Sequence, residues 1–382
     1  MLHYQPIQTH HFKNLEDLKD YTSDEQKHIQ RVPLKNLLDS KSCFNLDTQF
    51  MNLKTGFTFN EAGIKSLCQT VGVPFNLLTR LQGAGLASDV LNDVFAQPET
   101  LKKLQNQHLV VDDRTNQILC LVSQSYRNYS NFSFLEDLLE TGFKDNEFSF
   151  QEAVVSNTNL VLRTLSPKVK GCMKQRDGSD GEDVTTLGLQ LRNSMVGESS
   201  VFAEYYTLRR ICGNGMTVKV GGNTTRVYHS GKQSSFAYRL NTQIGKAIEG
   251  FEQVLTMIRT LGALEFRPRK LAELKAPVFE VLPQLKEASR EINAFYSRND
   301  EERESRLIND HSALIETIPE QFGGETSACV FNSPFRTNAS LWDFLNVFTE
   351  HAKTLDHSER LDVEEKVGQL SVWCANHQTQ LN

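Results

Sequence analysis

The stretch from Glu147 to about Tyr228 most constrains the fold, because strand-like segments follow one another there with no helical segment between them. Phe148–Ser156 and Asn159–Leu165 form one pair of such segments, and Thr185–Ser194 and Val201–Met216 form a second pair. Consecutive strands joined by short turns form antiparallel sheets, whereas a doubly wound parallel sheet needs a helix between its strands. The sequence therefore predicts an α+β fold with a central antiparallel β-meander.

Helical patterns flank this β unit on both sides. Residues 46–146 show helical spacing interrupted by one hairpin, His108–Asp112 with Gln117–Val122, and residues 234–382 are helical. Residues 1–45 are polar with few apolar positions, which predicts a loosely packed N-terminal arm. The expected parts are thus the arm 1–45, a helical unit with a β-hairpin 46–146, the antiparallel β unit 147–233 and a C-terminal helical region 234–382.

Apolar residues in heptad spacing open the C-terminal region. The seam consists of Leu240, Ile244, Ala247, Phe251, Val254, Ile258 and Leu261. Such a seam on one continuous helix needs a partner helix. The partner is either a second copy of the chain, which makes a homo-oligomer through residues 240–261, or the helices that follow Leu282 in the same chain.

Composition and charge exclude several classes of protein. Lys and Arg number 41 against 47 Asp and Glu, so a generally basic nucleic-acid coat is excluded and any anion site must be local. The longest apolar run, Ile118–Val122, is far shorter than the roughly 20 residues of a membrane helix, and the N-terminus has no secretion-signal pattern. Scattered cysteines without a CxxC pair indicate reduced thiols. We therefore expect a cytoplasmic protein with no membrane partner.

Familiar motifs for catalysis and cofactor binding do not occur in the sequence. No stretch matches a P-loop, a dinucleotide fingerprint or a GxSxG motif. Cys212 follows Arg209 and Arg210, which would favour a reactive thiolate if they lay close, but cysteine is more often a small buried hydrophobe. On one continuous helix, His351 and His357 would point about 120° apart, which does not suit a metal ion. We therefore predict no catalytic residue, no cofactor and no metal.

The most suggestive electrostatic feature is a basic stretch in the β unit, within fourteen residues that contain no acid. Its members are Arg163, Lys168, Lys170, Lys174 and Arg176. Neighbouring strands would add Arg192, Arg209 and Arg210, with Tyr205 and Tyr206 as aromatic faces on which bases stack. These ten residues form the predicted site for single-stranded nucleic acid.

Two plainer interpretations of this basic patch remain open. Acidic residues follow at once between Asp177 and Asp183 and could neutralise the basic stretch, so charge alone slightly favours a solvated loop. Glu198 or Glu204 on a neighbouring strand would equally serve as a salt-bridge partner for Arg209 or Arg210.

A resemblance to a known family rests on four stretches in a fixed order. They are a helix-turn-helix-like run from Phe59-Asn-Glu-Ala to Gly72-Val-Pro-Phe75, the strand and turn Ile118–Tyr126, the run from Leu191-Arg-Asn-Ser194 through Gly197 to Leu208-Arg-Arg-Ile-Cys-Gly-Asn-Gly-Met216, and Trp342–His357 with Asn346, Thr349 and Glu350. In these stretches the chain resembles the phage- and plasmid-borne proteins grouped as domain of unknown function 932. The resemblance implies a mobile genetic element and no settled activity.

The resulting hypothesis is a non-enzymatic protein of a phage or plasmid that binds single-stranded DNA in recombination or replication, in the manner of annealing proteins. The analogy in genetic setting supports this step. One alternative is a protein-interaction factor that neutralises a host defence system, which the acidic net charge suits equally well. Another is an enzyme of unfamiliar type that acts on nucleic acid.

Overall fold

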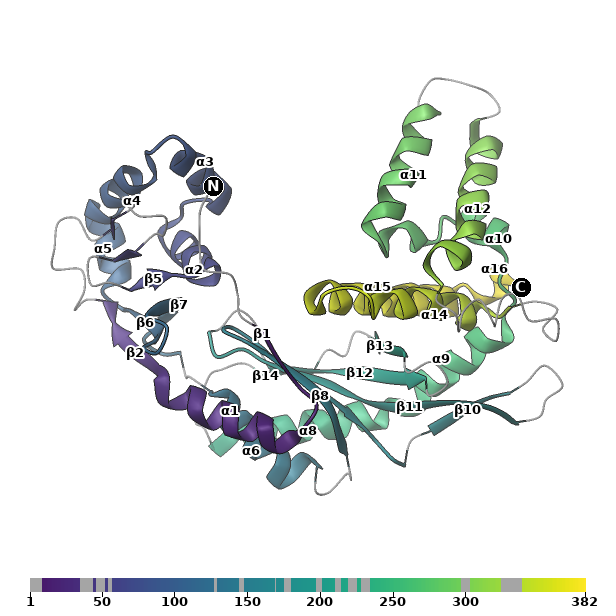
Figure 1. The fold of residues 1–382 in the computed structure, drawn as a ribbon, viewed down its shortest axis with the longest axis horizontal. Helices are drawn as coiled ribbons and strands as arrows, with labels where there is room; N and C mark the ends of the chain where they lie inside the picture. The colour runs from purple at the N-terminus through teal and green to yellow at the C-terminus, as the bar shows by residue number, and fades with distance from the viewer. Residues whose placement is uncertain are drawn as a thin grey trace.

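The computed structural model describes residues 9–34, 44–45, 52–53, 57–126, 129–143, 148–168, 170–174, 180–196, 201–209, 214–218, 225–227, 234–296, 303–323 and 339–382. Figure 1 shows an open, U-shaped arrangement around two sheets. The larger sheet forms the base, the smaller sheet and its helices form one arm, and the helices α11 (Pro283–Phe295) and α12 (Arg303–Phe322) form the other. The predicted α+β class is confirmed.

The larger sheet is eight-stranded and antiparallel. Its order is β1 (Thr9–Phe12), β8 (Ser149–Ser156), β9 (Leu160–Leu165), β11 (Asp180–Asn193), β12 (Val201–Arg209) and β13 (Asn214–Val218), with β10 (Lys170–Lys174) paired to β11 and β14 (Thr225–Val227) paired to β12. The β8–β9 and β11–β12 pairs match the two predicted pairs, so the central antiparallel meander is confirmed.

Alternation along the strands gives this sheet one apolar and one polar face. Leu162, Leu189 and Leu191 lie on the apolar face and are buried in the main core, together with residues of α8 (Ser234–Glu249) and α9 (Phe251–Ala263). The polar face carries Arg163 and Gln190, which pair directly across β9 and β11. The helix α15 (His357–Asn376) lies against this polar face (Figure 1).

The smaller sheet and its helices have a core of their own. The sheet order is β2 (Ile29–Pro33), β6 (Gln107–Asp112), β7 (Gln117–Ser123), β5 (Thr58–Phe59), β4 (Asn52–Leu53) and β3 (Phe44–Asn45), and the helices are α2 (Glu61–Val71), α3 (Phe75–Gly83), α4 (Ala87–Ala96) and α5 (Pro98–Leu104). β6 and β7 form the predicted hairpin, and Asn116 in its turn has a φ of 53°. Phe59, Ile64 and Leu78 are buried in this second core.

The N-terminal segment differs from the expected loosely packed arm. β1 pairs with β8, and β2 pairs with β6, so the segment joins both sheets. Between them, α1 (Leu15–His28) begins at the N-cap Asn14 and buries Leu18 in the main core. Although apolar positions are few here, those present at helical spacing suffice to dock the helix. The boundaries proposed at residues 46, 147 and 234 stay predictions.

The C-terminal region is helical, as expected. In addition to α8, α9, α11, α12 and α15 it contains α10 (Pro268–Glu273), the 3₁₀ turn η3 (Pro277–Glu280), α14 (Leu341–Ala352) and α16 (Gln378–Leu381). α14 begins with a capping box, in which Ser340 and Asp343 bond each other's backbone amides. A further α6 (Asn131–Asp137) and the π-helical turn η2 (Leu138–Phe143) precede β8 and pack in the main core. Among the described residues, the helices lack the combined length and apolar character that crossing a membrane requires.

The predicted heptad seam does not lie on one continuous helix. Gly250 separates α8 from α9. Apart from Ala247, whose side chain lies outside the described residues, every seam residue is buried in the main core. Of the two partners expected for this seam, the structure shows the second, because the chain's own sheet and helices cover it. A homo-oligomer stays a prediction.

Candidate nucleic-acid interface

Arg163, the first residue of the predicted basic patch, is buried at the centre of an ion-pair network. Its guanidinium donates to Glu152 Oε1 at 2.8 Å, to Gln190 Oε1 at 2.9 Å and to Glu364 of α15. The guanidinium carbon lies 4.7 Å from the centre of the Tyr206 ring, which is a cation–π geometry. Arg163 and Tyr206 are each 1% exposed, so neither side chain can contact a nucleic acid in this structure.

The charges in this network balance one another. Arg360 of α15 pairs with both carboxylates, at 3.2 Å from Glu152 and 2.8 Å from Glu364. Burial opposes ionisation of Glu152, yet Arg163 and Arg360 outweigh it and hold the pKa of this carboxyl below its usual range. Burial also opposes the charge on Arg163, but Glu364 and the other partners raise its pKa overall. The network therefore joins α15 to the sheet through a set of ion pairs.

Two further residues of the predicted patch also have structural partners. Tyr205 points to the apolar face of the sheet, where its ring lies 5.9 Å from that of Phe251, and it is 8% exposed. Tyr205 is therefore also unavailable for base stacking. Arg192 is partly exposed, and its guanidinium lies 3.9 Å from Glu204 and 3.8 Å from Glu365. Glu204, one of the two partners predicted for Arg209 or Arg210, thus lies near Arg192. The pairing of Arg209 or Arg210 itself stays a prediction, because their side chains are outside the described residues.

The remaining predicted site residues are only partly described. Lys168 is exposed beyond the end of β9. Lys170 and Lys174 lie in β10 and Arg209 at the end of β12, but their side chains are outside the described residues. Arg176, Arg210 and Cys212 lie wholly outside them. The structure thus brings Arg163 and Tyr206 together in the interior, and the basic β10 region stays a prediction.

Of the two histidines considered for a metal site, only His351 has a described side chain. His351 packs edge-on against Phe322 at a ring distance of 5.0 Å. The side chain of His357 is outside the described residues. No group of at least three His, Cys, Asp or Glu side chains suited to a metal ion occurs where side chains are described.

A second candidate interface lies on the smaller unit, where α2 and α3 form a helix-turn-helix. α2 ends at Gly72, which has a left-handed φ of 79°, and α3 begins after Pro74. The amides of Gly72 and Val73 both donate to Cys68 O, at 2.9 and 3.0 Å, and so close the end of α2. Leu67, Cys68 and Leu78 are buried between the helices and the sheet. A short glycine-containing turn between two such helices is typical of DNA-binding proteins.

Local contacts fix α2 on the sheet. Asn60 caps the helix by accepting from the amide of Gly63 at 2.7 Å. Gly63 lies so close to β7 that an added Cβ would be 2.3 Å from Ile118 O. Ser66 Oγ both donates to Leu121 O and accepts from Leu121 N, each at 3.0 Å. α2 is therefore held firmly, and α3 lies beyond it on the outside.

The outer face of α3 carries side chains that can read DNA bases. Asn76, Leu77 and Arg80 are exposed, and their spacing places them on one side of the helix. Leu77 is 46% exposed although it is a large apolar residue. In major grooves, asparagine pairs with adenine, arginine pairs with guanine, and apolar side chains contact the thymine methyl group.

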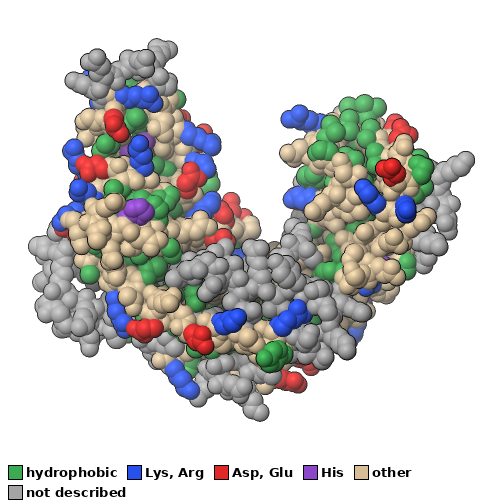
Figure 2. All heavy atoms as spheres, turned by 180° about the vertical axis from the view of Figure 1, so that it is seen from behind, with side chains coloured by type: hydrophobic (Ala, Val, Ile, Leu, Met, Phe, Trp, Pro, Cys, Tyr) green, Lys and Arg blue, Asp and Glu red, His purple; other side chains and the backbone are tan. Residues whose placement is uncertain are grey.

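The position of α3 in the molecule leaves room for a large ligand. In Figure 1, α2 and α3 lie on the side of the smaller unit that is turned toward α11. Figure 2 shows a hollow between the two arms, and Lys and Arg side chains border it on both. The sequence analysis identified the run from Phe59 to Phe75 only as part of a family resemblance. The features in the sequence that indicate this motif are Gly72 between the two helices and the spacing of the apolar residues Leu67, Cys68 and Leu78, which are buried.

Comparisons of the chain with models of protein families, with curated proteins and with solved structures found no match. The resemblance to the domain of unknown function 932 family therefore stays a prediction.

Proposed function

We propose that this chain is a DNA-binding protein that places α3 in the major groove of duplex DNA. The observation that carries the proposal is the exposed face of α3 with Asn76, Leu77 and Arg80, presented after a left-handed glycine turn. Recognition helices of helix-turn-helix proteins contact base edges with residues near their N-termini. Contact with a thymine methyl group would also give a reason for the exposure of Leu77.

The first helix of the motif supplies a cation for the DNA backbone. Lys65 of α2 is half exposed, pairs with Glu61 at 2.6 Å, and lies 5.5 Å from the centre of the Phe75 ring at the start of α3. An exposed pair of this kind is worth about 0–1 kcal/mol, so a phosphate can replace Glu61 at little cost. α2 would thus cross the backbone while α3 reads bases.

As a second candidate function, we propose that the β unit binds single-stranded DNA, as an annealing-type protein would. What supports it is the exposed Lys168 next to β10, whose strand contains Lys170 and Lys174. The mobile-element setting implied by the family resemblance suits both forms, since such elements encode proteins that act on duplexes and on single strands.

Binding of labelled DNA, followed by fluorescence anisotropy across a salt series, tests the proposal. A duplex enriched from a random pool by the wild-type chain is compared with its separated strands. Arg80→Ala and Leu77→Ser are expected to weaken duplex binding by about tenfold, since one base contact is worth about 1–3 kcal/mol. Arg259→Ala is the control, because Arg259 is a half-exposed arginine on the distant helix α9.

The outcomes separate the two DNA forms. Loss of duplex affinity in both α3 variants with an unchanged control supports the proposal. Binding confined to single strands and weakened by Lys168→Ala supports the β unit and contradicts the role of α3. Duplex binding that neither α3 variant changes, or the lack of any DNA binding at low salt, contradicts the proposed major-groove reading.

A further inference from the structure

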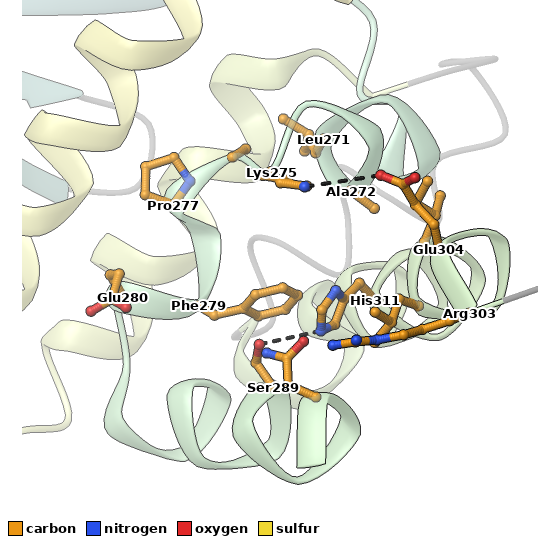
Figure 3. A pocket seen from close by; sticks show the side chains of 14 residues that line it. Leu271, Ala272, Lys275, Pro277, Phe279, Glu280, Ser289, Arg303, Glu304 and His311 are labelled. Carbon is orange, nitrogen blue, oxygen red and sulfur yellow. Dashed lines mark hydrogen bonds and ion pairs between the residues drawn. The ribbon is translucent and has the colours of Figure 1, made fainter. Parts of the chain in front are cut away.

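A cavity of about 810 Å³ lies among the C-terminal helices, away from α2 and α3. It is open to solvent on one side and lined by residues of α10, η3, α11 and α12, and its size falls within the usual range for small-molecule sites. Leu271, Ala276 and Ile308 are among its apolar lining residues. Figure 3 shows Lys275 and Glu304 on one side of the cavity and Phe279, His311, Ser289 and Arg303 on the other.

Two rings form an aromatic wall in this cavity. The Phe279 and His311 rings lie 4.9 Å apart with an angle of 46° between their planes. Ser289 Oγ lies 3.3 Å from His311 Nε2 and so fixes the imidazole, while burial lowers the His311 pKa and favours the neutral ring. An uncharged, oriented imidazole beside a phenyl ring suits the face of a planar, apolar ligand group.

Two cations line the same cavity. Lys275 extends from the turn after α10 toward Glu304, at a distance of 4.0 Å with both side chains more than 80% exposed. Arg303 lies at the start of α12, and no described carboxylate is paired with it. The carboxylate of Glu280 is engaged by Lys286 instead. The lining therefore offers two donors of positive charge that an anion can reach at little cost.

The backbone conformation of Lys275 is a second, independent observation about this residue. Its φ is 54°, a left-handed conformation that favours glycine. Lys275 N donates to Ala272 O and Ala276 N donates to Leu271 O, at 3.1 and 2.9 Å, which is the helix ending that usually contains glycine at this position. The lysine thus occupies a position where glycine would be more stable, next to a cavity that its ammonium group borders.

We propose that this cavity binds a small planar organic anion, with its ring against Phe279 and His311 and its phosphate or carboxylate between Lys275 and Arg303. Ser289 and Asn293, which also line the cavity, supply hydrogen-bonding groups for polar atoms of the ring. A nucleoside monophosphate and an aromatic carboxylate share this chemistry. The proposal does not depend on the DNA-binding role of α3.

Isothermal titration calorimetry on the full chain tests this site with four probes. Adenosine 5′-monophosphate and benzoate combine a ring with an anion, whereas adenosine lacks the charge and inorganic phosphate lacks the ring. Binding of one or both of the first two, with at least about tenfold weaker binding of both partial probes, is the expected result, since charge-assisted hydrogen bonds are each worth that much. Whichever of the first two binds more tightly identifies the source of the anion.

Two variants and a matched control separate binding from folding. Lys275→Gly is expected to weaken binding by about tenfold while raising the midpoint of thermal unfolding, because it removes the cation and relieves the left-handed backbone. Arg303→Gln is expected to weaken binding to a similar extent. Asn116→Gly relieves the same kind of backbone conformation in the distant β6–β7 turn, and should leave binding unchanged.

Three results would overturn the proposal. They are the lack of binding of both ring-containing anions at millimolar concentration, equal binding of adenosine or of inorganic phosphate, and binding that neither Lys275→Gly nor Arg303→Gln weakens. None of these results bears on duplex binding by α3, so the two proposals fail separately.

Discussion

Arg163 on β9 and Glu364 on α15 form an ion pair across the interface of sheet and helix, and each side chain is only 1% exposed. The pair explains why the sheet can bury a polar face. Two charges removed from water at this depth are tolerated because both also pair with further partners, Glu152 for the arginine and Arg360 for the glutamate. The pair thus holds the C-terminal helices in register with the central sheet.

Glu364→Gln tests this role. The substitution keeps the shape of the side chain but removes the charge, so the buried guanidinium loses its closest anionic partner. We expect the free energy of unfolding to fall by about 3 kcal/mol, as when one member of a buried pair is removed. Urea denaturation at neutral pH measures the change.

Asp362→Asn on the same helix is the control. Asp362 is 62% exposed and pairs with Lys366 at 2.6 Å. Removal of this exposed pair should change the free energy of unfolding by less than about 1 kcal/mol. Equal effects of the two substitutions would contradict the structural role of the Arg163–Glu364 pair.

Glu25 gives the fold a pH dependence that an exposed glutamate would not. This residue of α1 is 3% exposed, and burial raises its pKa to about 7 although Asn131 donates to it at 3.0 Å. The folded chain therefore holds this proton more tightly than the unfolded chain. The contribution of Glu25 to stability must then fall as the pH rises from about 4.5 to about 7, and it stays lower above that range.

The Glu25→Gln variant isolates this contribution. We expect it to be more stable than the wild type by about 3 kcal/mol at pH 8, and to show little difference at pH 4.5. Urea denaturation at several pH values measures both. Glu16→Gln, on the same helix but 71% exposed, should keep the wild-type pH dependence. A wild-type slope retained in Glu25→Gln would assign the pH dependence to another group.

Local patterns predicted the strands better than their partners. The alternation in Phe148–Leu165 and Thr185–Met216 identified the meander, because each turn and each apolar face is encoded within a few residues. Arg163 was different. In the sequence, Arg163 lies in a strand close to several lysines. Its buried acidic partner, Glu364, lies in a helix near the other end of the chain. A partner so distant in sequence leaves no local signal.

The heptad seam also shows that a local sequence pattern does not specify its tertiary partner. Its described apolar residues are buried, but Gly250 interrupts the helix where the Tyr205 hydroxyl approaches. A Cβ on this glycine would lie 1.8 Å from that hydroxyl. Tertiary packing thus separates the segment into two helices, although its apolar pattern predicts one. Helical periodicity identifies buried positions, but it does not say whether the partner is the same chain or a second copy.

Gly63 controls how closely α2 approaches the smaller sheet. An alanine Cβ at this position would lie 2.3 Å from Ile118 O, and this oxygen belongs to the backbone of β7, which cannot rotate away. Gly63→Ala must therefore displace α2, and we expect a loss of about 1–3 kcal/mol in the free energy of unfolding. Thermal and urea denaturation both measure this loss.

Gly245→Ala is the matched substitution, and we expect it to change stability in the opposite direction. No heavy atom lies within 4 Å of a Cβ added at Gly245 in α8, so alanine should stabilise that helix by about 0.5–1 kcal/mol. Because α2 carries α3, the displacement in Gly63→Ala should also weaken duplex binding under conditions where the variant is folded. Gly245→Ala should bind duplex DNA like the wild type. Unchanged duplex binding by folded Gly63→Ala would show that the position of α3 on the sheet does not govern DNA recognition.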